Sequence, residues 1–324
     1  MAATRGWRQA PRAEGPFEVR RDDIPALNEV FSDAFTERYR RDGMVGVRVP
    51  FLNPAVWRYA IDDADGGAML WRGPHGEIVA FNIAHRSGTE GWMGPLAVRP
   101  DMQSRGLGKD VVQAGVEWLR TRGARVIGLE TMPRTMDNIG FYSSLGFVPG
   151  RLTITVTIDA AAAPEAPVLV GRLTSADRAS AIAACRGLAD AQIAGYDFTR
   201  EVEITDELSL GDTVLLRERA EVSAFALCHT VPLVEGRSRE ELRVLKMVLM
   251  HDDQLEPLVG SLADFARRSG ARRVAFRVQG EYTNVYQRLI AMGGRVRWTD
   301  LRMTVGGHAE PRARGGVVLS NWEI

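Results

Sequence analysis

The sequence predicts an α/β (α+β) fold made of two tandem domains, each a mixed, mostly antiparallel sheet flanked by helices. Three observations support this prediction. The chain has 324 residues, whereas one domain usually holds about 150. An Ala/Pro-rich tract, residues 159–167, interrupts the pattern of helices and strands. The same order of predicted elements then occurs on both sides of that tract.

These observations set the expected domain boundaries. We expect an N-terminal domain at 16–158, a linker at 159–167, a C-terminal domain at 168–306 and a tail at 307–324. Residues 1–15 are positively charged but have no apolar stretch, so we interpret them as a disordered leader and not as a signal peptide. No apolar run is long enough to span a bilayer, and we expect a soluble, cytoplasmic protein with no membrane partner.

Composition excludes several classes of protein. Hydrophobic residues make up 45% and charged residues 25% of the chain, as in ordinary globular proteins. The 41 basic and 41 acidic residues balance, which argues against nucleic acid as a partner. Two cysteines, Cys185 and Cys228, are too few for a disulfide framework and are expected in the core. Of the basic residues, only Lys109 and Lys246 are lysines.

In the first half, apolar residues alternate or cluster in the expected strands and recur every three or four positions in the expected helices. The expected strands are 17–20, 68–72, 77–86, 91–98, 125–130 and a pair ending at 151–158, and the expected helices are 22–40, 109–123 and 137–146. The segment GPHG predicts a turn between the second and third strands. No element is predicted in the Gly- and Pro-punctuated stretch that ends at residue 67.

The second half begins the same order again. Its expected strands are 168–173, 212–218, 222–231, 242–250, 273–278 and 296–305, and its expected helices are 175–192, 257–270 and one more before the last strand. A shift of 147 residues superposes parts of the two halves: Gly123 falls on Gly270, Ile127 on Val274, Gly146 on Gly293 and Thr157 on Thr304. This match indicates a duplication, and convergent α/β patterning is the alternative.

The segment LAVRPDMQSRGLGK, residues 96–109, is the most informative about function. A strand ends there and glycines stand where a helix begins. The first N–H groups of a helix lack partners and carry partial positive charge, and glycine lets an anion approach them closely. Arg105 and Lys109 add charge, so the expected ligand is a phosphate or pyrophosphate. A simple tight turn is the alternative, since neither a P-loop nor a GxGxxG fingerprint is present.

A second motif, FYSSLGF, places Tyr142 39 residues after Gln103 on the expected helix 137–146. Together with LAVRPDMQSRGLG, this motif resembles the GNAT acyltransferase superfamily. In that family the first motif binds the pyrophosphate of acetyl-CoA, and the second supplies a tyrosine near the thioester sulfur. The resemblance covers both halves in architecture but only the first half in motifs.

The resemblance implies an N-acetyltransferase in which a primary amine of a small molecule attacks the thioester of acetyl-CoA directly. A backbone N–H near Val98 would polarise the thioester carbonyl, and Tyr142 would protonate the departing thiolate. A core aromatic is the alternative for Tyr142. The implied acetyl-CoA contacts are Leu96, Ala97, Val98, Gln103, Ser104, Arg105, Gly106, Leu107, Gly108, Lys109, Asn138 and Tyr142, and no metal is expected.

The general base is less defined. Some family members carry a glutamate six residues before the position of Val98, where this chain has Trp92. Glu130, at the end of the strand 125–130, is the next candidate. Glu90, His85 and a water relay without a dedicated base stay open.

Two further sites concern the substrates. The asparagine often found seven residues before the tyrosine is Thr135 here, with Asn138 nearby. The acceptor pocket is expected from the first helix and residues 43–57. Phe31 and Phe35 are expected to pack on the sheet, Tyr39 is a candidate for the pocket, and Trp57 and Arg48 are expected in the pocket or at its rim.

The second half lacks the motif residues. Under the 147-residue shift, Tyr142 falls on Leu289 and Glu130 on Arg277. The loop is about five residues shorter and reads HDDQLEP, whose three carboxylates would repel a pyrophosphate. We therefore expect a degenerate domain without acetyl-CoA. A metal site at His251–Asp253 is the alternative, although adjacent side chains rarely converge on one ion.

The second domain is expected to support the first, by completing its acceptor cleft or by mediating a homodimer. The segment 316–324 could add a strand to a neighbouring sheet edge. Two other functions stay open: a protein N-acetyltransferase acting on an N-terminus or lysine, and a non-catalytic CoA-sensing or interaction module.

Overall fold

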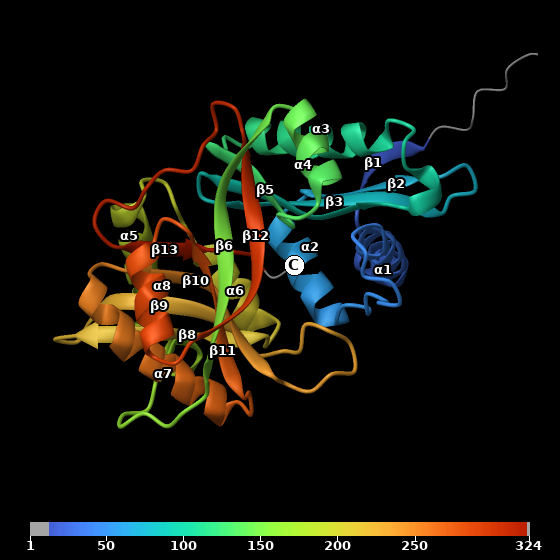
Figure 1. Cartoon of the computed structure of the whole chain (residues 1–324). Coiled ribbons are helices and arrows are strands. Elements are labelled where there is room, and N and C mark those ends of the chain that lie inside the picture. The colour runs from blue at the N-terminus through green and yellow to red at the C-terminus, as the bar shows by residue number, and fades with distance from the viewer. Residues whose placement is uncertain (1–12, 323–324) are drawn as a thin grey trace, which may run out of the picture.

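The computed structural model describes residues 13–322. The first half of the chain forms a sheet with helices on both faces. Its elements are β1 (Glu14–Glu18), α1 (Ile24–Arg41), α2 (Pro54–Ala64), β2 (Ala68–Arg72), β3 (Ile78–Ser87), β4 (Glu90–Val98), α3 (Leu107–Thr121), β5 (Val126–Thr131), α4 (Met136–Ser144) and β6 (Phe147–Asp159). In Figure 1, α3 and α4 lie above this sheet and α1 and α2 below it.

The second half repeats this order. Its elements are β7 (Val168–Leu169), α5 (Ser175–Gln192), α6 (Thr199–Glu207), β8 (Gly211–Glu218), β9 (Glu221–His229), β10 (Glu241–Leu249), α7 (Leu255–Arg268), β11 (Arg273–Gln279), α8 (Thr283–Ala291), β12 (Arg295–Val305) and β13 (Val317–Ser320). The equivalent helices α1 and α5 have 18 residues each, and α4 and α8 have 9 each. The predicted fold class, two tandem domains of one plan, is confirmed.

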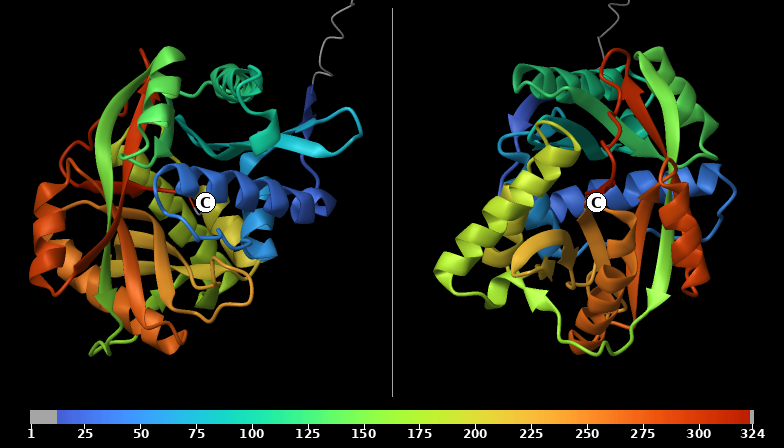
Figure 2. Two further views of the ribbon diagram at one scale, coloured as in Figure 1. Left: turned by 45° about the vertical axis from the view of Figure 1, so that its right-hand side comes forward. Right: turned by 90° about the vertical axis from the view of Figure 1, so that its left-hand side faces the viewer.

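One continuous sheet joins the halves, in the order β1-β2-β3-β4-β5-β12-β6-β11-β10-β9-β8-β7, with β13 beside β10. Neighbouring strands are antiparallel except for β4/β5 and β10/β11, which are parallel. The last strand of each half is exchanged: β12 pairs with β5, whereas β6 pairs with β11. The strands β6 and β12 also pair with each other and run side by side through the middle of the molecule (Figures 1 and 2).

Apolar side chains fill the space between the sheet and each helix layer. Under α1 and α2 the core contains Leu27, Trp57 and Phe81, all without exposed surface, and under α3 it contains Val112 and Leu119. Burial of such a side chain contributes about 1.5–3 kcal/mol. The second half is packed in the same way, and Cys185 and Cys228 are free and buried in it, as expected.

Helix α2 lies in the stretch where no element was predicted. Asn53 caps it, because its side chain accepts a hydrogen bond from the Ala55 N–H at 2.9 Å, and Pro54 occupies the first helical position. Both residue types favour a helix start. Its inner side buries Val56 and Tyr59. Helix α6, its equivalent in the second half, was also missed.

Several strands differ from the prediction, and the expected strand 168–173 is shortened to β7 because the chain turns at Val170–Arg172. The strand β1 begins at Glu14 and not at residue 17, so the end of the expected leader is ordered, while residues 1–12 lie outside the described part of the chain. The expected strand pair ending at residue 158 is one strand, β6. The tail forms the expected extra strand, β13, but inside the sheet and not at an edge. Among the described helices, none has the length and apolar character to cross a membrane.

Candidate active site

A cavity of about 790 Å³ opens where β4 and β5 separate. The two strands pair only between Glu90–Met93 and Val126–Leu129 and then diverge. Gly94–Val98, the remaining part of β4, lines the cavity together with the beginning of α3, one side of α1 and residues along α4. The cavity therefore joins the predicted phosphate loop to the predicted catalytic residues.

The loop between β4 and α3 has the form of an anion site. Ser104 and Gly106 have φ values of 61° and 89°, in the left-handed region. The side chain of Gln103 donates to the Val98 carbonyl at 2.9 Å, which fixes the loop to the end of β4. Helix α3 begins at Leu107 with Gly106 as its N-cap and no side-chain cap, so its first N–H groups and the Lys109 ammonium are available to an anion.

Most of the predicted acetyl-CoA contacts line this one cavity. They are Leu96, Ala97, Val98, Gln103, Ser104, Gly106, Gly108, Lys109, Asn138 and Tyr142. Arg105 and Leu107 do not line it: Arg105 extends toward the Met102 sulfur, at 3.8 Å, and the Leu107 side chain is buried in the core. Gly108 lies beside the Phe141 ring, where an added Cβ would be 3.4 Å from it, so α3 and α4 are in contact at this point.

Tyr142 lies on α4 and borders the cavity. Only 7% of its surface is exposed, and its ring packs against Phe141 and Phe147, with centroids 5.2 and 6.0 Å away. Burial raises the pKa of Tyr142 to about 12. The phenol therefore keeps its proton at neutral pH, as a proton donor must.

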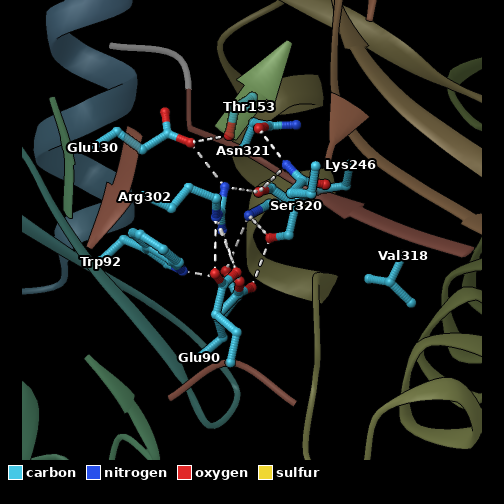
Figure 3. Close-up of polar contacts among 12 residues, drawn as sticks. Glu90, Trp92, Glu130, Thr153, Lys246, Arg302, Val318, Ser320 and Asn321 are labelled. Atoms are coloured by element: carbon cyan, nitrogen blue, oxygen red, sulfur yellow. Dashed lines mark hydrogen bonds and ion pairs between the residues drawn. The ribbon is translucent and has the colours of Figure 1, made fainter. Parts of the chain in front are cut away.

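Glu130 lies at the end of β5 and also lines the cavity. Its carboxylate accepts hydrogen bonds from Thr153, at 2.6 Å, and from Arg302, at 2.9 Å (Figure 3). It also forms an ion pair with Arg277. Burial opposes the charge of Glu130, but Arg277 and Arg302 outweigh it and lower the pKa of the carboxyl. A lowered pKa makes Glu130 a weaker base than an ordinary glutamate.

The other two base candidates are engaged elsewhere. His85 lines the cavity, but its Nδ1 lies 3.0 Å from Asp63 Oδ2 and its Nε2 3.0 Å from the Gly94 carbonyl oxygen. Glu90 is not among the lining residues. It accepts hydrogen bonds from Trp92, at 2.9 Å, and from Ser320, at 2.6 Å, and burial raises its pKa.

The second half of the chain supplies one wall of the cavity, in line with the expectation that it completes the acceptor cleft, although the individual residues were not predicted there. Arg277 from β11, Trp298, Asp300 and Arg302 from β12, and Asn321 and Trp322 after β13 all line the cavity. The Asp300 carboxylate accepts from the Trp298 indole N–H and from Arg277, each at 3.0 Å. Burial raises the pKa of Asp300, although Arg277 opposes this shift. Asp300 thus combines a position in the cavity with a raised pKa, which suits a general base.

The aromatic residues expected around the acceptor are only partly in place. Phe31, Phe35 and Tyr39 of α1 line the cavity, and Phe31 also belongs to the core, as expected. The expectation for Trp57 and Arg48 is wrong. Trp57 is fully buried and donates to the Asn28 side chain at 2.7 Å, and Arg48 pairs with Asp33 at the surface.

In the second half, the loop equivalent to the phosphate loop is closed by its own side chains. Arg288 of α8 pairs with Glu256 and donates to the Asp252 carbonyl, and Asn284 donates to the Asp252 carboxylate. The expected carboxylates therefore occupy this place, with Glu256 paired to Arg288 and Asp252 hydrogen-bonded to Asn284. Among residues 13–322, no group of three or more His, Cys, Asp or Glu side chains is placed to hold a metal ion.

Comparison with known proteins identifies the family. Residues 25–147 match the model of the acetyltransferase (GNAT) family. These residues form a GNAT domain. The match includes the phosphate loop, Glu130 and Tyr142, as the resemblance of the two motifs implied. GNAT domains in general bind acetyl-CoA and transfer its acetyl group, and the matched residues have the fold of such a domain.

Solved structures extend the GNAT fold to the whole chain. A protein from Pyrococcus horikoshii that carries the name of an acetyltransferase has a TM-score of 0.67 at 16% identity, over 99% of this chain and 98% of that one. A GCN5-related N-acetyltransferase from Sphaerobacter thermophilus has a TM-score of 0.57 at 16% identity, over 91% of this chain and 96% of that one. A tandem GNAT protein from the clavulanic acid biosynthesis pathway has a TM-score of 0.57 at 11% identity, over 93% of this chain and 100% of that one. No curated protein matches the sequence.

Proposed function

We propose that the protein is an acetyl-CoA-dependent N-acetyltransferase that acetylates a primary amine of a small molecule. Residues 16–158 are the catalytic domain and residues 168–306 the degenerate one, separated by the linker 159–167 and followed by the tail 307–324. The observation that carries this proposal is the single cavity that connects the uncapped N-terminus of α3 with Tyr142, Glu130 and Asp300.

The first part of the cavity suits the cofactor arm of acetyl-CoA. The N–H groups at the start of α3 and the Lys109 ammonium would hold the pyrophosphate. The unpaired segment of β4, Gly94–Val98, offers backbone groups to the extended arm, and one N–H near Val98 would polarise the thioester carbonyl. When bound, acetyl-CoA supplies an acyl group activated for transfer.

The reacting groups are placed at the divergence of β4 and β5. The amine nitrogen forms a bond to the acyl carbon, and the carbon–sulfur bond breaks. Tyr142 gives its proton to the sulfur. The carboxylate pair of Glu130 and Asp300 takes the proton of the amine, directly or through one water molecule, and Asp300 is the stronger base of the two because its pKa is raised.

A small acceptor suits this region better than a protein segment. Residues of β12 and of the tail, together with Leu233, line the cavity beside those of the first half and so limit the space for an acceptor. A lysine or N-terminus of another protein would have to pass between these elements. Protein N-acetylation is the second candidate, and a CoA-sensing module the third.

The test measures release of free CoA from acetyl-CoA with a panel of small amines and, separately, with peptides that have free N-termini or lysines. Turnover of a small amine at a higher kcat/KM than any peptide supports the proposal. Turnover of peptides alone assigns the protein candidate. Binding of acetyl-CoA in calorimetry with no turnover of any acceptor assigns the sensing module.

A further inference from the structure

The same pair of parallel strands separates at the same place in both halves of the sheet. In the second half, β10 and β11 pair between Glu241–Val244 and Arg273–Phe276 and then diverge, as β4 and β5 do after Met93. The strands β4 and β10 also share an irregularity at this place. The register of β4 against β3 shifts just after Met93, and that of β10 against β9 shifts just after Val244. The second half therefore contains a cleft equivalent to the one that lines the active-site cavity.

This second cleft is filled by the chain itself. The strand β13 lies antiparallel to β10, with Lys246 opposite Ser320 and Leu249 opposite Val317. Its side chains are buried to 95% or more, from 1% exposed at Leu319 to 4% at Val318. The Val318 N–H donates to the Tyr282 hydroxyl at 3.2 Å. The backbone of β10 thus has a protein partner where that of β4 has an open cavity.

Beyond β13 the chain is tied to both halves. Ser320 accepts a hydrogen bond from the buried Lys246 ammonium at 2.9 Å and donates to Glu90 of the first half at 2.6 Å. Asn321 donates to the Arg277 carbonyl at 3.0 Å. Figure 3 shows Ser320 between Lys246 and Glu90, with Asn321 beside them. These contacts lead the chain out of the second cleft and toward the first.

The segment then delivers an aromatic side chain to the active-site cavity. Trp322 lines this cavity and is 8% exposed. The Lys246 ammonium lies 3.6 Å from the centre of its ring, a close cation–π contact. The ring centroids of Trp92 and His85, both cavity residues, lie 5.8 and 6.1 Å away. Three rings from β3, β4 and the tail therefore form one aromatic wall.

We propose that residues Val317–Trp322 permanently occupy the cofactor cleft of the second half and that Trp322 determines acceptor specificity in the first. The degenerate cleft then holds a strand of the protein in place of a cofactor arm. The aromatic wall favours an amine with an aromatic or apolar body over an extended polyamine, because only the former buries apolar surface there. The specificity part of this inference rests on the proposed acetyltransferase function.

The first test compares Trp322→Ala and Trp322→Phe with Trp118→Ala as a matched control. Trp118 lies on α3 against Arg122 and outside the cavity lining. We expect Trp322→Ala to lower the kcat/KM preference for phenethylamine over spermidine about tenfold, with the Kd of acetyl-CoA changed by less than about twofold. Trp322→Phe should restore most of the preference, and Trp118→Ala should keep it. An unchanged preference in Trp322→Ala would overturn the specificity assignment.

The second test does not depend on catalysis. Hydrogen exchange of the wild-type protein should show the backbone amides of 317–321 protected as strongly as those of β10, and calorimetry should show one acetyl-CoA per chain. Exchange at the rate of a free peptide, or binding of two acetyl-CoA molecules, would overturn the occupied-cleft assignment. If the wild-type protein acetylates no amine, the proposed function fails, while these two measurements still decide whether the segment fills the cleft.

Discussion

Glu130 and Arg277 form an ion pair although they stand 147 residues apart, at equivalent positions of the two halves. The end of β5 carries one and the corresponding part of β11 carries the other. The exchanged strands β6 and β12 lie between them in the sheet. Arg277 also pairs with Asp300 at 3.0 Å. The internal symmetry of the chain thus brings an arginine of the second half to a carboxylate of the first half.

Replacing Arg277 by Gln should move the acidic limb of the pH–rate profile to higher pH. Arg277 lowers the pKa of both Glu130 and Asp300, so its loss raises both values, and the carboxylates are protonated at a higher pH. We expect the limb in kcat/KM to shift by about one pH unit toward alkaline pH. The measurement is kcat/KM between pH 5 and 9. Arg273→Gln, on the same strand but paired with Glu240 and Glu241, is the control, and a limb that stays in place would refute the coupling.

Tyr142→Phe should lower kcat about a hundredfold, because the thiolate leaves without a proton donor. The ring and its packing stay, so the Kd of acetyl-CoA should not change. Because the pKa of Tyr142 is raised to about 12, this residue should cause no alkaline fall of kcat in the wild type below about pH 10. Steady-state release of CoA and calorimetry give the two parameters. A variant with wild-type kcat would show that the tyrosine is only a core aromatic.

Gly106→Glu should weaken acetyl-CoA binding at least tenfold. It places a negative charge beside the expected pyrophosphate and a side chain at a φ of 89°. Gly123→Glu is a matched control, since Gly123 has a φ of 78° and, like Gly106, open space around it, but lies outside the cavity lining. Calorimetry with both variants separates the charge effect from backbone strain. Equal affinities in the two variants would place the phosphate site elsewhere.

The stability of Glu201→Gln, compared with that of the wild type, should increase as the pH rises from acidic to alkaline. Burial and the nearby Asp63 raise the pKa of Glu201 from 4.5 to about 7, although Lys246 opposes the shift. The folded state therefore binds a proton that the unfolded state releases. The stability from this group is fully present below pH 4.5 and is lost as pH rises through 7.

Between pH 5 and 8, the free energy of unfolding of the wild type should fall relative to that of Glu201→Gln, by up to about 3 kcal/mol. Urea unfolding at several pH values measures this difference. Glu203 is exposed on the same helix, α6, so the free energy of unfolding of Glu203→Gln should depend on pH as that of the wild type does. Parallel curves for Glu201→Gln as well would mean that Glu201 stays ionised in the fold.

The sequence predicted the features that depend on local contacts. The loop 99–108 and Tyr142 are recognisable because the anion site is built from consecutive backbone groups and the tyrosine belongs to one helix. The spacing of apolar residues along the chain also predicted most of the strands and helices. Helix α2 was missed because Gly and Pro residues around it conceal a short amphipathic pattern, although Asn53-Pro54 is a start signal for a helix.

The wall of the acceptor site could not be predicted in the same way. Asp300 and Trp322 reach the cavity only because β12 joins the first half of the sheet and β13 fills the second cleft. Such pairings depend on contacts between residues that stand 68 to 176 positions apart in the sequence. The sequence indicated that the second domain could complete the acceptor cleft, and the 147-residue shift set Glu130 on Arg277, but this shift indicated equivalent positions and not contact.

The exchange of β6 and β12 also bears on whether one half of the chain could be lost in evolution. If the second copy were deleted, β5 would lose its neighbour β12 and present an unprotected edge, and β6 would lose β11. Each copy is therefore a scaffold on which the other completes its fold. In this arrangement neither copy can be deleted without exposing strand edges of the other, so both are retained for the sake of the shared sheet, whatever chemistry each performs.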